Sequence, residues 1–494
     1  MAARRDEITG KERLAMGLAI LSPERAYGTM TKLSDKWQMS RQALYAMAVK
    51  LKDGIETLLS PGPHGPVAET PWVDDNRLKR MTVVLCECGV SQRGTQKCLS
   101  EGLDANMSLG WVNKTLYDAE KAAARVNAMW QPKSDESLSG DEIYSQDQPN
   151  LLLVGNESTY VYALTRQLDC TGETWGCVLL DHPTCPQFNS DAGVGLASGV
   201  KQAGLLVHQL DWDHVIRPMW GQVCRGEAQA YAAIAAYEAR LVLYKEAKTP
   251  GRLAQHLAVL NRLAQEMQEK ITRADDFRKL AEQVDAEFGL IEINSGRVRN
   301  PDLAAQRLQV IGQLFKQWTG VIYQKVGSYF SNLSTGLFAY VPRLQSALQP
   351  LFERWGTPAI LALSRIWQYE ADIRRHPRSD IECQRIHKAW ATCLDDAFLV
   401  LGDQLWLAWD EISAILGKVW RGSSLAECIN SKLRPVLNRR DQTDQGCLDL
   451  FRFLHNSRVY NRGKRAGYSP AQLVDLDVPD DPLTLLGFSP KVSI

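Results

Sequence analysis

The hydrophobic pattern in the first quarter of the chain is that of helices. A short predicted helix over 27–37 is followed by a second, RQALYAMAVKLK, in which Leu44, Met47 and Leu51 recur at helical spacing. Ser40 stands directly before the second helix and is its expected N-cap. Two helices joined by so short a turn predict a helix-turn-helix unit, whose second helix enters the major groove of DNA. A plain helical bundle is the alternative, because short helix pairs are common.

The outward-facing side chains of that second helix are Arg41, Gln42 and Tyr45, and they are the expected contacts with DNA. A second helix pair is predicted over 91–100 and 109–129, with a glycine stop after the first helix and a serine cap before the second. This pair is either another helix-turn-helix unit or part of a bundle.

The period then changes from helical to alternating. The polar segment QPKSDESLSG, residues 131–140, is expected to be a linker. Three strand-like runs follow, GDEIYS, NLLLVGNE and STYVYALTRQL, separated by turns at Gln148-Pro149 and Asn156-Glu157.

Beyond these strands, helix and strand alternate. A helix is expected over 171–180, then a short strand, QFNSD, that ends on Asp191. A further helix, AGVGLASGVKQA, and an apolar strand, GLLVHQLD, follow. Three strands in a meander followed by alternating helix and strand predict a mixed sheet with helices on its faces.

From about 216 to about 418 the sequence gives no strand signal. Amphipathic runs such as GEAQAYAAIAAYEARLVLYKEA predict a large all-helical module. The chain then closes with a helix, SLAECINSKLRPVL, capped by Ser423 or Ser424, and a second helix, DQGCLDLFRFLHNSRVYN. Six tryptophans of the module are expected to be core aromatics rather than a platform for stacking bases: Trp318, Trp355, Trp367, Trp390, Trp406 and Trp409.

Charge is balanced overall and uneven locally. The 494 residues include 57 basic and 57 acidic ones, so the formal net charge of zero points to no partner by itself. A hydrophobic content of 45% and a charged content of 23% are typical of a globular protein, and the length predicts about three domains. The stretch 434–465 holds eight Lys and Arg against three Asp, and is either a solvated face or a surface for DNA.

The cysteines and the start of the chain favour a cytoplasmic protein with reduced thiols, associated with the nucleoid if bacterial. The first residues lack the apolar segment of a secretion signal, and no window offers about 18 uninterrupted apolar residues. The eleven cysteines follow no disulfide framework. Cys170, Cys177, His182 and Cys185 could suggest zinc, but their spacings do not match paired short loops, and buried thiols are the other interpretation.

Three acidic residues stand where a sheet and a returning helix could bring them together. Asp141 is expected at the head of the first strand, Asp191 at the end of the fourth, and Glu427 in the first helix after the helical module. A carboxylate within a strand is costly to bury without a task. Three carboxylates can hold two Mg²⁺ ions about 4 Å apart for phosphodiester transfer. Among 57 acidic residues, three unrelated surface acids are the alternative.

Four stretches of the chain share features with one family. They are SGDEIYSQDQPNLLLVGNESTYVYAL, SDAGVGLASGV, QLDWDHV with Asp211 and His214 in an Asp-x-x-His arrangement, and SSLAECINSKLRPVL together with FRFLHNSRVYNRGKRAGYSPAQLV. In these stretches the chain resembles the DDE-type transposases with a retroviral-integrase-type core. The style is closest to the hAT, Mutator-like and bacterial insertion-sequence enzymes.

The resemblance implies a fold of α/β plus all-α type. A ribonuclease-H-like mixed sheet would be split by a large all-helical insertion and preceded by a helical, helix-turn-helix DNA-binding region. The implied segments are 1–130 for DNA binding, 138–215 and 419–475 for the core, 216–418 for the insertion, and 476–494 for a C-terminal tail.

The resemblance also implies an activity. The chain would hydrolyse a phosphodiester at transposon ends and transfer the freed 3′-hydroxyl to target DNA, using two Mg²⁺ ions, or Mn²⁺ in their place. It would act on double-stranded DNA as a homodimer or higher oligomer. Asp141 would bridge both ions, and Asp191 and Glu427 would hold one each. His214 would bind near the scissile phosphate or orient a ligand, unless it is simply a polar residue at a strand end. The implied DNA contacts near the core are Trp420, Arg421, Asn430, Arg434, Arg458 and Arg462.

One feature departs from the family pattern. Some relatives carry Tyr-x2-Arg-x3-Glu-x6-Lys around the catalytic Glu. Counted from Glu427, Trp420 and Arg434 could keep the aromatic and cationic roles, whereas Ser423 stands in place of the Arg, with Arg421 nearby. Two other interpretations remain, a nuclease with the same core that cuts without joining, and a domesticated DNA-binding protein with a vestigial triad.

Overall fold

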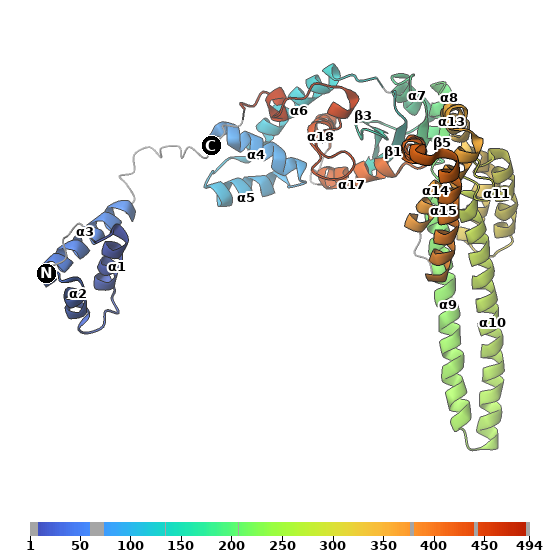
Figure 1. The fold of residues 1–494 in the computed structure, drawn as a ribbon, viewed down its shortest axis with the longest axis horizontal. Coiled ribbons are helices and arrows are strands. Elements are labelled where there is room, and N and C mark those ends of the chain that lie inside the picture. The colour runs from blue at the N-terminus through green and yellow to red at the C-terminus, as the bar shows by residue number, and fades with distance from the viewer. Residues whose placement is uncertain are drawn as a thin grey trace. The chain divides into compact units, whose positions relative to one another are not determined.

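The computed structural model describes residues 8–59, 74–133, 135–205, 207–375, 380–438 and 443–490. Contacts divide the chain into two units, Met1–Asp74 and Asp75–Ile494, and the described structure is mostly helical, with one five-stranded sheet in the second unit (Figure 1). No helix in these ranges is long and apolar enough to cross a membrane.

The first unit is a cluster of three helices around a small apolar core. The core contains Met16, Ile20, Met30, Leu44 and Ala48. These residues recur at helical spacing, so each helix buries one side against the others. The helices are α1 (Gly10–Leu21), α2 (Thr29–Trp37) and α3 (Arg41–Leu59).

The joint between α2 and α3 is short. Gln38 ends α2 in the left-handed region, at φ 49°. The Ser40 hydroxyl accepts a hydrogen bond of 3.1 Å from the Ala43 N–H, so the expected N-cap is confirmed. The three outward-facing residues expected on α3 are exposed: Arg41, Gln42 and Tyr45.

A second trio of helices belongs to the unit that holds the sheet. One of them, α6, shares a buried core with the strands through Val112, Leu116 and Val126. The division of contacts falls after Asp74, so these helices are in the same unit as the sheet. The trio consists of α4 (Asp75–Glu87), α5 (Gln92–Leu103) and α6 (Leu109–Met129).

The predicted helix ends in this trio are partly correct. Ser108 caps α6, because its hydroxyl accepts a hydrogen bond from the Trp111 N–H at 3.1 Å. The predicted stop at Gly102 is wrong, since α5 continues to Leu103 and ends on Asp104 in the left-handed region. A glycine near a helix end weakens the helix without having to stop it.

The sheet has five strands in the order β3-β2-β1-β4-β5. β1 pairs antiparallel with β2, and β2 with β3, whereas β4 runs parallel to β1 and β5 parallel to β4. The predicted mixed sheet is therefore confirmed. The strands are β1 (Leu138–Ser145), β2 (Gln148–Gly155), β3 (Val161–Arg166), β4 (Phe188–Ser190) and β5 (His208–Leu210).

The segment expected to be a linker is partly built into the sheet. β1 begins at Leu138, so Asp141 lies inside the strand and not at its head. Ahead of the strand, the Glu136 carboxylate accepts hydrogen bonds from the backbone N–H groups of Glu157 (2.7 Å) and Ser158 (2.9 Å), which close the turn after β2. Polar composition alone does not distinguish such a turn-capping segment from a linker.

The first hairpin turns two residues earlier than predicted. Gln146 and Asp147 form the turn with φ of 51° and 59°, the positive values that two-residue hairpin turns require. Pro149 instead lies in β2, opposite Tyr144. It is the second residue of the strand, near the end, where proline's missing N–H is tolerated.

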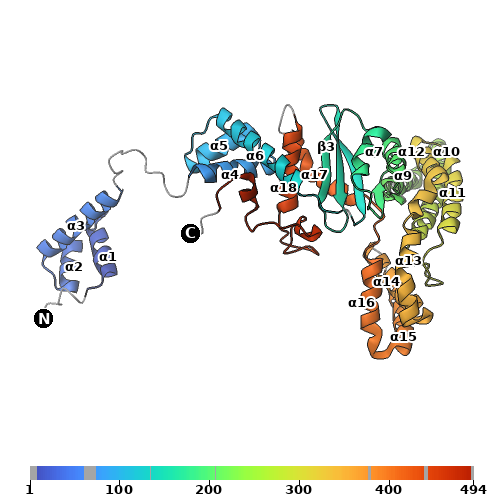
Figure 2. The ribbon, with the colours of Figure 1, turned by 90° about the horizontal axis from the view of Figure 1, so that it is seen from above.

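Helices cover both faces of the sheet (Figure 2). The alternation in β2 separates the faces, because Leu152 packs toward α17 and α18, whereas Leu151 and Leu153 join the core shared with α7 and α8. The covering helices are α7 (Gly172–Leu180), α8 (Val194–Gln202), α17 (Ser424–Asn438) and α18 (Gln445–Ser457).

Between β5 and α17 the described chain consists of helices and the loops that join them, with one isolated bridge, Ile291 with Val298, and no strand. α9 and α10 run alongside each other as a long antiparallel pair (Figure 1). Of the six tryptophans, five lie in or against the core of this module, and Trp406 is 63% exposed, so the core prediction is wrong for that residue. The helices are α9 (Asp213–Glu246), α10 (Pro250–Glu287), α11 (Pro301–Lys316), α12 (Val321–Leu333), α13 (Val341–Trp355), α14 (Thr357–Arg375), α15 (Asp380–Leu401) and α16 (Leu405–Leu416).

Candidate active site

Asp141 lies in the middle of β1 on the side that faces α17. The Asn430 side-chain N–H, from α17, donates a hydrogen bond to Asp141 Oδ2 at 2.8 Å, and the Glu142 backbone N–H donates to Oδ1 at 2.9 Å. Burial, opposed by these two bonds and reinforced by the charge of Asp191, raises the pKa of Asp141 to about 6. The carboxyl is therefore held in a place that disfavours its charge.

Asp191 directly follows β4, the parallel neighbour of β1. Ser139 pairs with Asn189, and the same register continued along the two strands brings Asp191 level with Asp141. Neighbouring strands lie about 4.8 Å apart. The two carboxylates thus lie close together, and the charge of Asp191 raises the pKa of Asp141.

Glu142 is a further acidic residue near Asp141 and Asp191, on the opposite face of β1 from Asp141, and it was not among the residues predicted from the sequence. Burial, together with the charges of Asp191 and Asp141, raises the pKa of Glu142 to about 7. Its Oε2 atom is buried without a hydrogen-bond partner. The sequence could have indicated Glu142, because the cost of burying a carboxylate within a strand applies to Glu142 as well as to Asp141.

Glu427 lies in the first turn of α17 and faces the start of α9. Its Oε1 is 3.9 Å from His214 Nε2, and its Oε2 is 3.7 Å from Arg217 Nη1. His214 and Arg217 are three residues apart, so they share one face of α9. A hydrogen bond to Asp211, opposed by burial and supported by the charges of Asp211, Asp191 and Glu427, raises the pKa of His214 to about 9.

Asp211 joins the end of β5 to the start of α17. Its Oδ2 accepts hydrogen bonds from the Ser423 N–H (2.8 Å), the Ser423 hydroxyl (2.6 Å) and His214 Nδ1 (3.3 Å), and its Oδ1 accepts from the Asp213 N–H (2.8 Å). Burial raises the pKa of Asp211, but these bonds outweigh burial and hold it below the usual value. A Cβ on Gly422 would lie 3.1 Å from Asp211 Oδ1, so glycine allows this close approach.

Ser423 also explains the departure from the family pattern. Its side chain is 1% exposed and is held by Asp211. An arginine there would not reach solvent without displacing the Asp211 contact. Ser423 therefore connects α17 to the sheet and is not a phosphate contact.

The donors around Asp141 fit a hard divalent cation in kind. The carboxylates of Asp141, Asp191 and Glu427 supply oxygen ligands, as Mg²⁺ prefers. One buried oxygen beside them, Asn430 Oδ1, has no hydrogen-bond partner. Within the part of the chain that the structure describes, no three His, Cys, Asp or Glu side chains are close enough to hold one ion. Binding a cation would therefore require these side chains to draw together.

The possible zinc ligands between β3 and β4 are Cys170, Cys177, His182 and Cys185. Among the residues that the structure describes, no three of them lie close enough together to hold a metal ion. All eleven cysteines are free thiols. Cys185 is buried, and burial raises its pKa to about 11, whereas Cys170 is half-buried and Cys177 is exposed. The buried-thiol interpretation thus holds for Cys185 alone among the three.

Two of the expected DNA contacts have other roles. Arg421 is enclosed, with its guanidinium 4.8 Å from the centre of the Trp212 ring and hydrogen-bonded to the Phe288 carbonyl, and burial lowers its pKa. Asn430 is 3% exposed and orients Asp141. The expectation that these two side chains bind the DNA backbone is therefore not supported by their positions.

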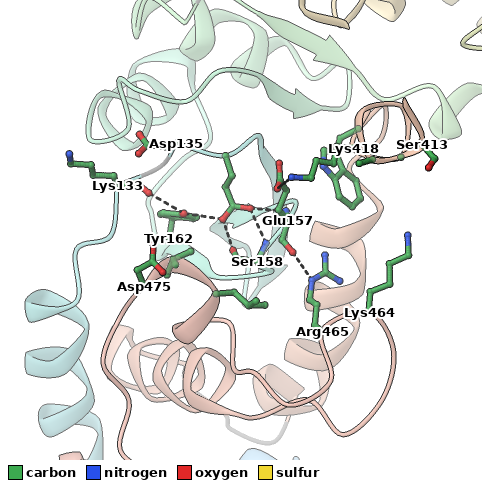
Figure 3. A pocket seen from close by; sticks show the side chains of 16 residues that line it. Lys133, Asp135, Glu157, Ser158, Tyr162, Ser413, Lys418, Lys464, Arg465 and Asp475 are labelled. Atoms are coloured by element: carbon green, nitrogen blue, oxygen red, sulfur yellow. Dashed lines mark hydrogen bonds and ion pairs between the residues drawn. The ribbon is translucent and has the colours of Figure 1, made fainter. Parts of the chain in front are cut away.

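Trp420 lies in the wall of a cavity of about 820 Å³ at the turn between β2 and β3 (Figure 3). Charged groups of this cavity bind one another, since Lys418 Nζ is 3.4 Å from the Glu157 carboxylate and Arg465 donates to the Glu157 carbonyl at 2.6 Å. The described lining residues do not include Asp141, Asp191 or Glu427. This cavity therefore belongs to the scaffold beside the sheet and not to the region around these three carboxylates.

The remaining expected contacts are exposed. Arg434 lies seven residues beyond Glu427 on the same side of α17, while Arg458 and Arg462 follow α18. Their guanidinium groups are thus available to a polyanion.

No protein-family model matches the chain, and a search of curated proteins finds no significant match.

Proposed function

We propose that the chain is a DDE-type DNA transposase, with a ribonuclease-H-like core split by the helices α9 to α16. The strand order β3-β2-β1-β4-β5, antiparallel for the first three strands and parallel for the last two, supports that fold. The proposal is supported most by the parallel pairing of β1 with β4, whose register, continued by two residues, would bring Asp191 level with Asp141, beside the helix that bears Glu427.

The proposed chemistry is transfer of a DNA phosphodiester. Two bound Mg²⁺ or Mn²⁺ ions would activate the attacking hydroxyl and stabilise the leaving oxygen. Asp141 would hold both ions, and Asp191 and Glu427 one each. Asn430 is a positioning residue, because its hydrogen bond fixes the rotamer of Asp141.

His214 and Arg217 would act on the phosphate. The raised pKa of His214, about 9, keeps the imidazole protonated at neutral pH. Both cations now lie within 4 Å of Glu427. If Glu427 held a metal ion instead, these two cations would be free to face the charge of a scissile phosphate.

DNA would be held by both units. In the first unit the exposed Arg41, Gln42 and Tyr45 on α3 would contact a major groove, as a helix-turn-helix unit does. In the second unit Arg434 would follow the backbone along the Glu427 side of α17. A homodimer or higher oligomer would bring two transposon ends together.

The test is DNA nicking with purified full-length chain. Supercoiled plasmid in Mn²⁺ is expected to be nicked by the wild type. Asp141→Asn, Asp191→Asn and Glu427→Gln are each expected to lower the rate by at least roughly 10³-fold, since each removes a metal ligand. Asp395→Asn, an exposed acid on α15, is the matched control and leaves the rate unchanged.

Joining separates a transposase from a nuclease with the same core. Duplex ends selected from a random pool by binding to the protein are supplied pre-cut, with plasmid as target. A transposase yields end-to-plasmid products, whereas a nuclease yields none. Nicking that persists at the wild-type rate in Asp141→Asn would rule out both enzymes.

A further inference from the structure

A second cavity, of about 690 Å³, lies between α4, α17 and α18. Its lining is mixed, with apolar surface from Pro435 and Phe451 and polar groups around the mouth. Three cations line it, Lys432, Arg458 and Arg462, and the described lining residues include one carboxylate, Glu87. The cavity therefore carries a positive excess, although the whole chain has no net charge.

The cations converge on the cavity. Arg458 Nη1 is 3.9 Å from Glu87 Oε1, and Glu87 is the more buried partner, 21% exposed against 72%. Burial raises the pKa of Glu87, while Arg458 and Lys432 lower it. Burial, opposed by a hydrogen bond with the Thr159 carbonyl and supported by the charges of Lys432 and Arg458, lowers the pKa of the neighbouring His455 to about 4. The pKa values of two separate groups, Glu87 and His455, are thus both lowered by the charges of Lys432 and Arg458.

The walls of the cavity are fixed. The Tyr460 hydroxyl is 2.7 Å from Thr159 Oγ1, and the Tyr460 backbone N–H donates to the Tyr468 carbonyl at 3.0 Å, so the loop after α18 is anchored on both sides. Gly89, at φ +81°, lies so close to α17 that a Cβ would stand 2.8 Å from Pro435 Cβ. The cations are therefore presented from a rigid frame, which lowers the entropy cost of binding.

We infer that this cavity binds a backbone phosphate of DNA through Lys432, Arg458 and Arg462, and that Glu87 holds Arg458 while no phosphate is bound. Arginine matches phosphate with paired N–H donors, and lysine adds a point charge. Lys432 lies five residues from Glu427 on α17, roughly 7.5 Å along the axis, within the reach of one DNA turn. The inference rests on the proposed function, because it assigns the cavity to the same DNA.

The experiment is binding of a fluorescein-labelled random-sequence duplex to the full chain in EDTA, followed by anisotropy at several salt concentrations. Arg458→Gln with Arg462→Gln is expected to weaken binding and to lower the slope of log K against log salt by about 1, the contribution of one lost phosphate contact. Arg458→Lys keeps the charge and most of the slope. Lys325→Gln, an exposed cation on α12, is the matched control and changes neither quantity.

Glu87→Gln is expected to change duplex affinity in the opposite direction. Removing the competing carboxylate is expected to tighten duplex binding severalfold without changing the slope. Inorganic phosphate distinguishes a DNA site from a site for a small anion. If millimolar phosphate binds the cavity while duplex affinity is insensitive to Arg458 and Arg462, the inference is overturned.

Failure of this inference is separable from failure of the proposed function. A wild type that nicks DNA, with an unchanged salt slope in the double variant, removes the cavity from the DNA path and leaves the carboxylate site in place. A wild type with no affinity for any duplex removes both. Since both arginines are exposed, the double variant is expected to unfold at the wild-type temperature, which confirms that lost binding is not lost structure.

Discussion

Asp211 and Asp141 are two buried or half-buried aspartates of the same sheet unit, and their surroundings have opposite effects on their charge. Around Asp211, three N–H groups and one hydroxyl converge, and the pKa lies below its usual value in spite of burial. Around Asp141, two N–H groups donate, Asp191 stands nearby, and the pKa rises to about 6.

The difference separates a carboxylate with a structural role from one that, in the proposed function, would hold a cation. Both carboxylate oxygens of Asp211 accept hydrogen bonds, so the region around it is complete. The donors connect the end of β5 to the starts of α9 and α17. The region around Asp141 holds more negative charge than its neighbours neutralise, with Glu142 also raised to a pKa of about 7. Such uncompensated carboxyls mark functional sites more often than structural ones.

The largest expected effect comes from breaking the completed region. Asp211→Asn turns one acceptor into a donor that faces the N–H and hydroxyl of Ser423, so the free energy of unfolding is expected to fall by about 3 kcal/mol. Because the folded pKa of Asp211 lies below the unfolded 3.8, its contribution is present above pH 3.8 and is lost only under more acidic conditions. Urea titration at pH 7 measures the change.

The control for this variant is Asp395→Asn, which removes the same charge from an exposed position on α15. It is expected to change the free energy of unfolding by less than about 0.5 kcal/mol. A loss below about 1 kcal/mol in Asp211→Asn would mean that its four hydrogen bonds do not hold α17 to the sheet.

The same substitution at Asp141 is expected to change the free energy of unfolding in the opposite direction. Native Asp141 binds its proton more tightly than the unfolded chain does, so it lowers stability as pH rises from 3.8 to about 6, with no further change above. Asp141→Asn is expected to unfold with about 2 kcal/mol more free energy than the wild type at pH 8, and with a similar free energy at pH 4.

Urea titrations at the two pH values measure this difference. Glu142 adds to it with the same sign, because removing the Asp141 charge lowers the pKa of Glu142 in the variant. If Asp141→Asn is less stable than the wild type at pH 8, the carboxylate is a structural group like Asp211, and the comparison between the two regions fails.

Much of this arrangement follows from the sequence by local rules. The strands around Asp141 and Asp191 were found because alternating or short apolar runs ended at turn residues. Because the two strands were expected to be neighbours in the sheet, their carboxylates were expected to lie close together. The hairpin turn was predicted wrongly at Pro149, because proline signals a turn more often than the second residue of an interior strand.

The roles of single side chains did not follow, because they depend on contacts between distant parts of the chain. Arg421 looks like a free cation in the sequence, yet in the fold it stacks on Trp212, which precedes α9. Ser423 looks like a helix cap or a lost arginine, yet it binds Asp211. Neither pairing has a spacing signal, since each joins residues on opposite sides of the helical insertion.

A divalent cation is expected to stabilise the Asp141 region and not the Asp211 region. Mg²⁺ at tenfold its dissociation constant raises the free energy of unfolding by about 1.4 kcal/mol if it binds only the folded chain. Asp141→Asn and Asp191→Asn are expected to lose this gain. Thermal unfolding in MgCl₂, against NaCl of the same ionic strength, measures it. An equal gain in the wild type and both variants would place the cation elsewhere.

The smallest effect separates the two halves of the Ser423 contact. Ser423→Ala removes the hydroxyl donor to Asp211 but keeps the backbone N–H, so the loss in urea titration is expected to be about 1 kcal/mol, a third of that for Asp211→Asn. Because Ser423 is enclosed and does not face DNA in the proposed function, the variant is expected to keep wild-type affinity for the duplex, unlike Arg458→Gln with Arg462→Gln. Ser423→Thr, which keeps the hydroxyl, is the matched control. Lost duplex affinity with unchanged stability in Ser423→Ala would give this position the phosphate-binding role that an arginine has in the enzymes that the sequence resembles. The hydrogen bonds around Asp211 would then need another explanation.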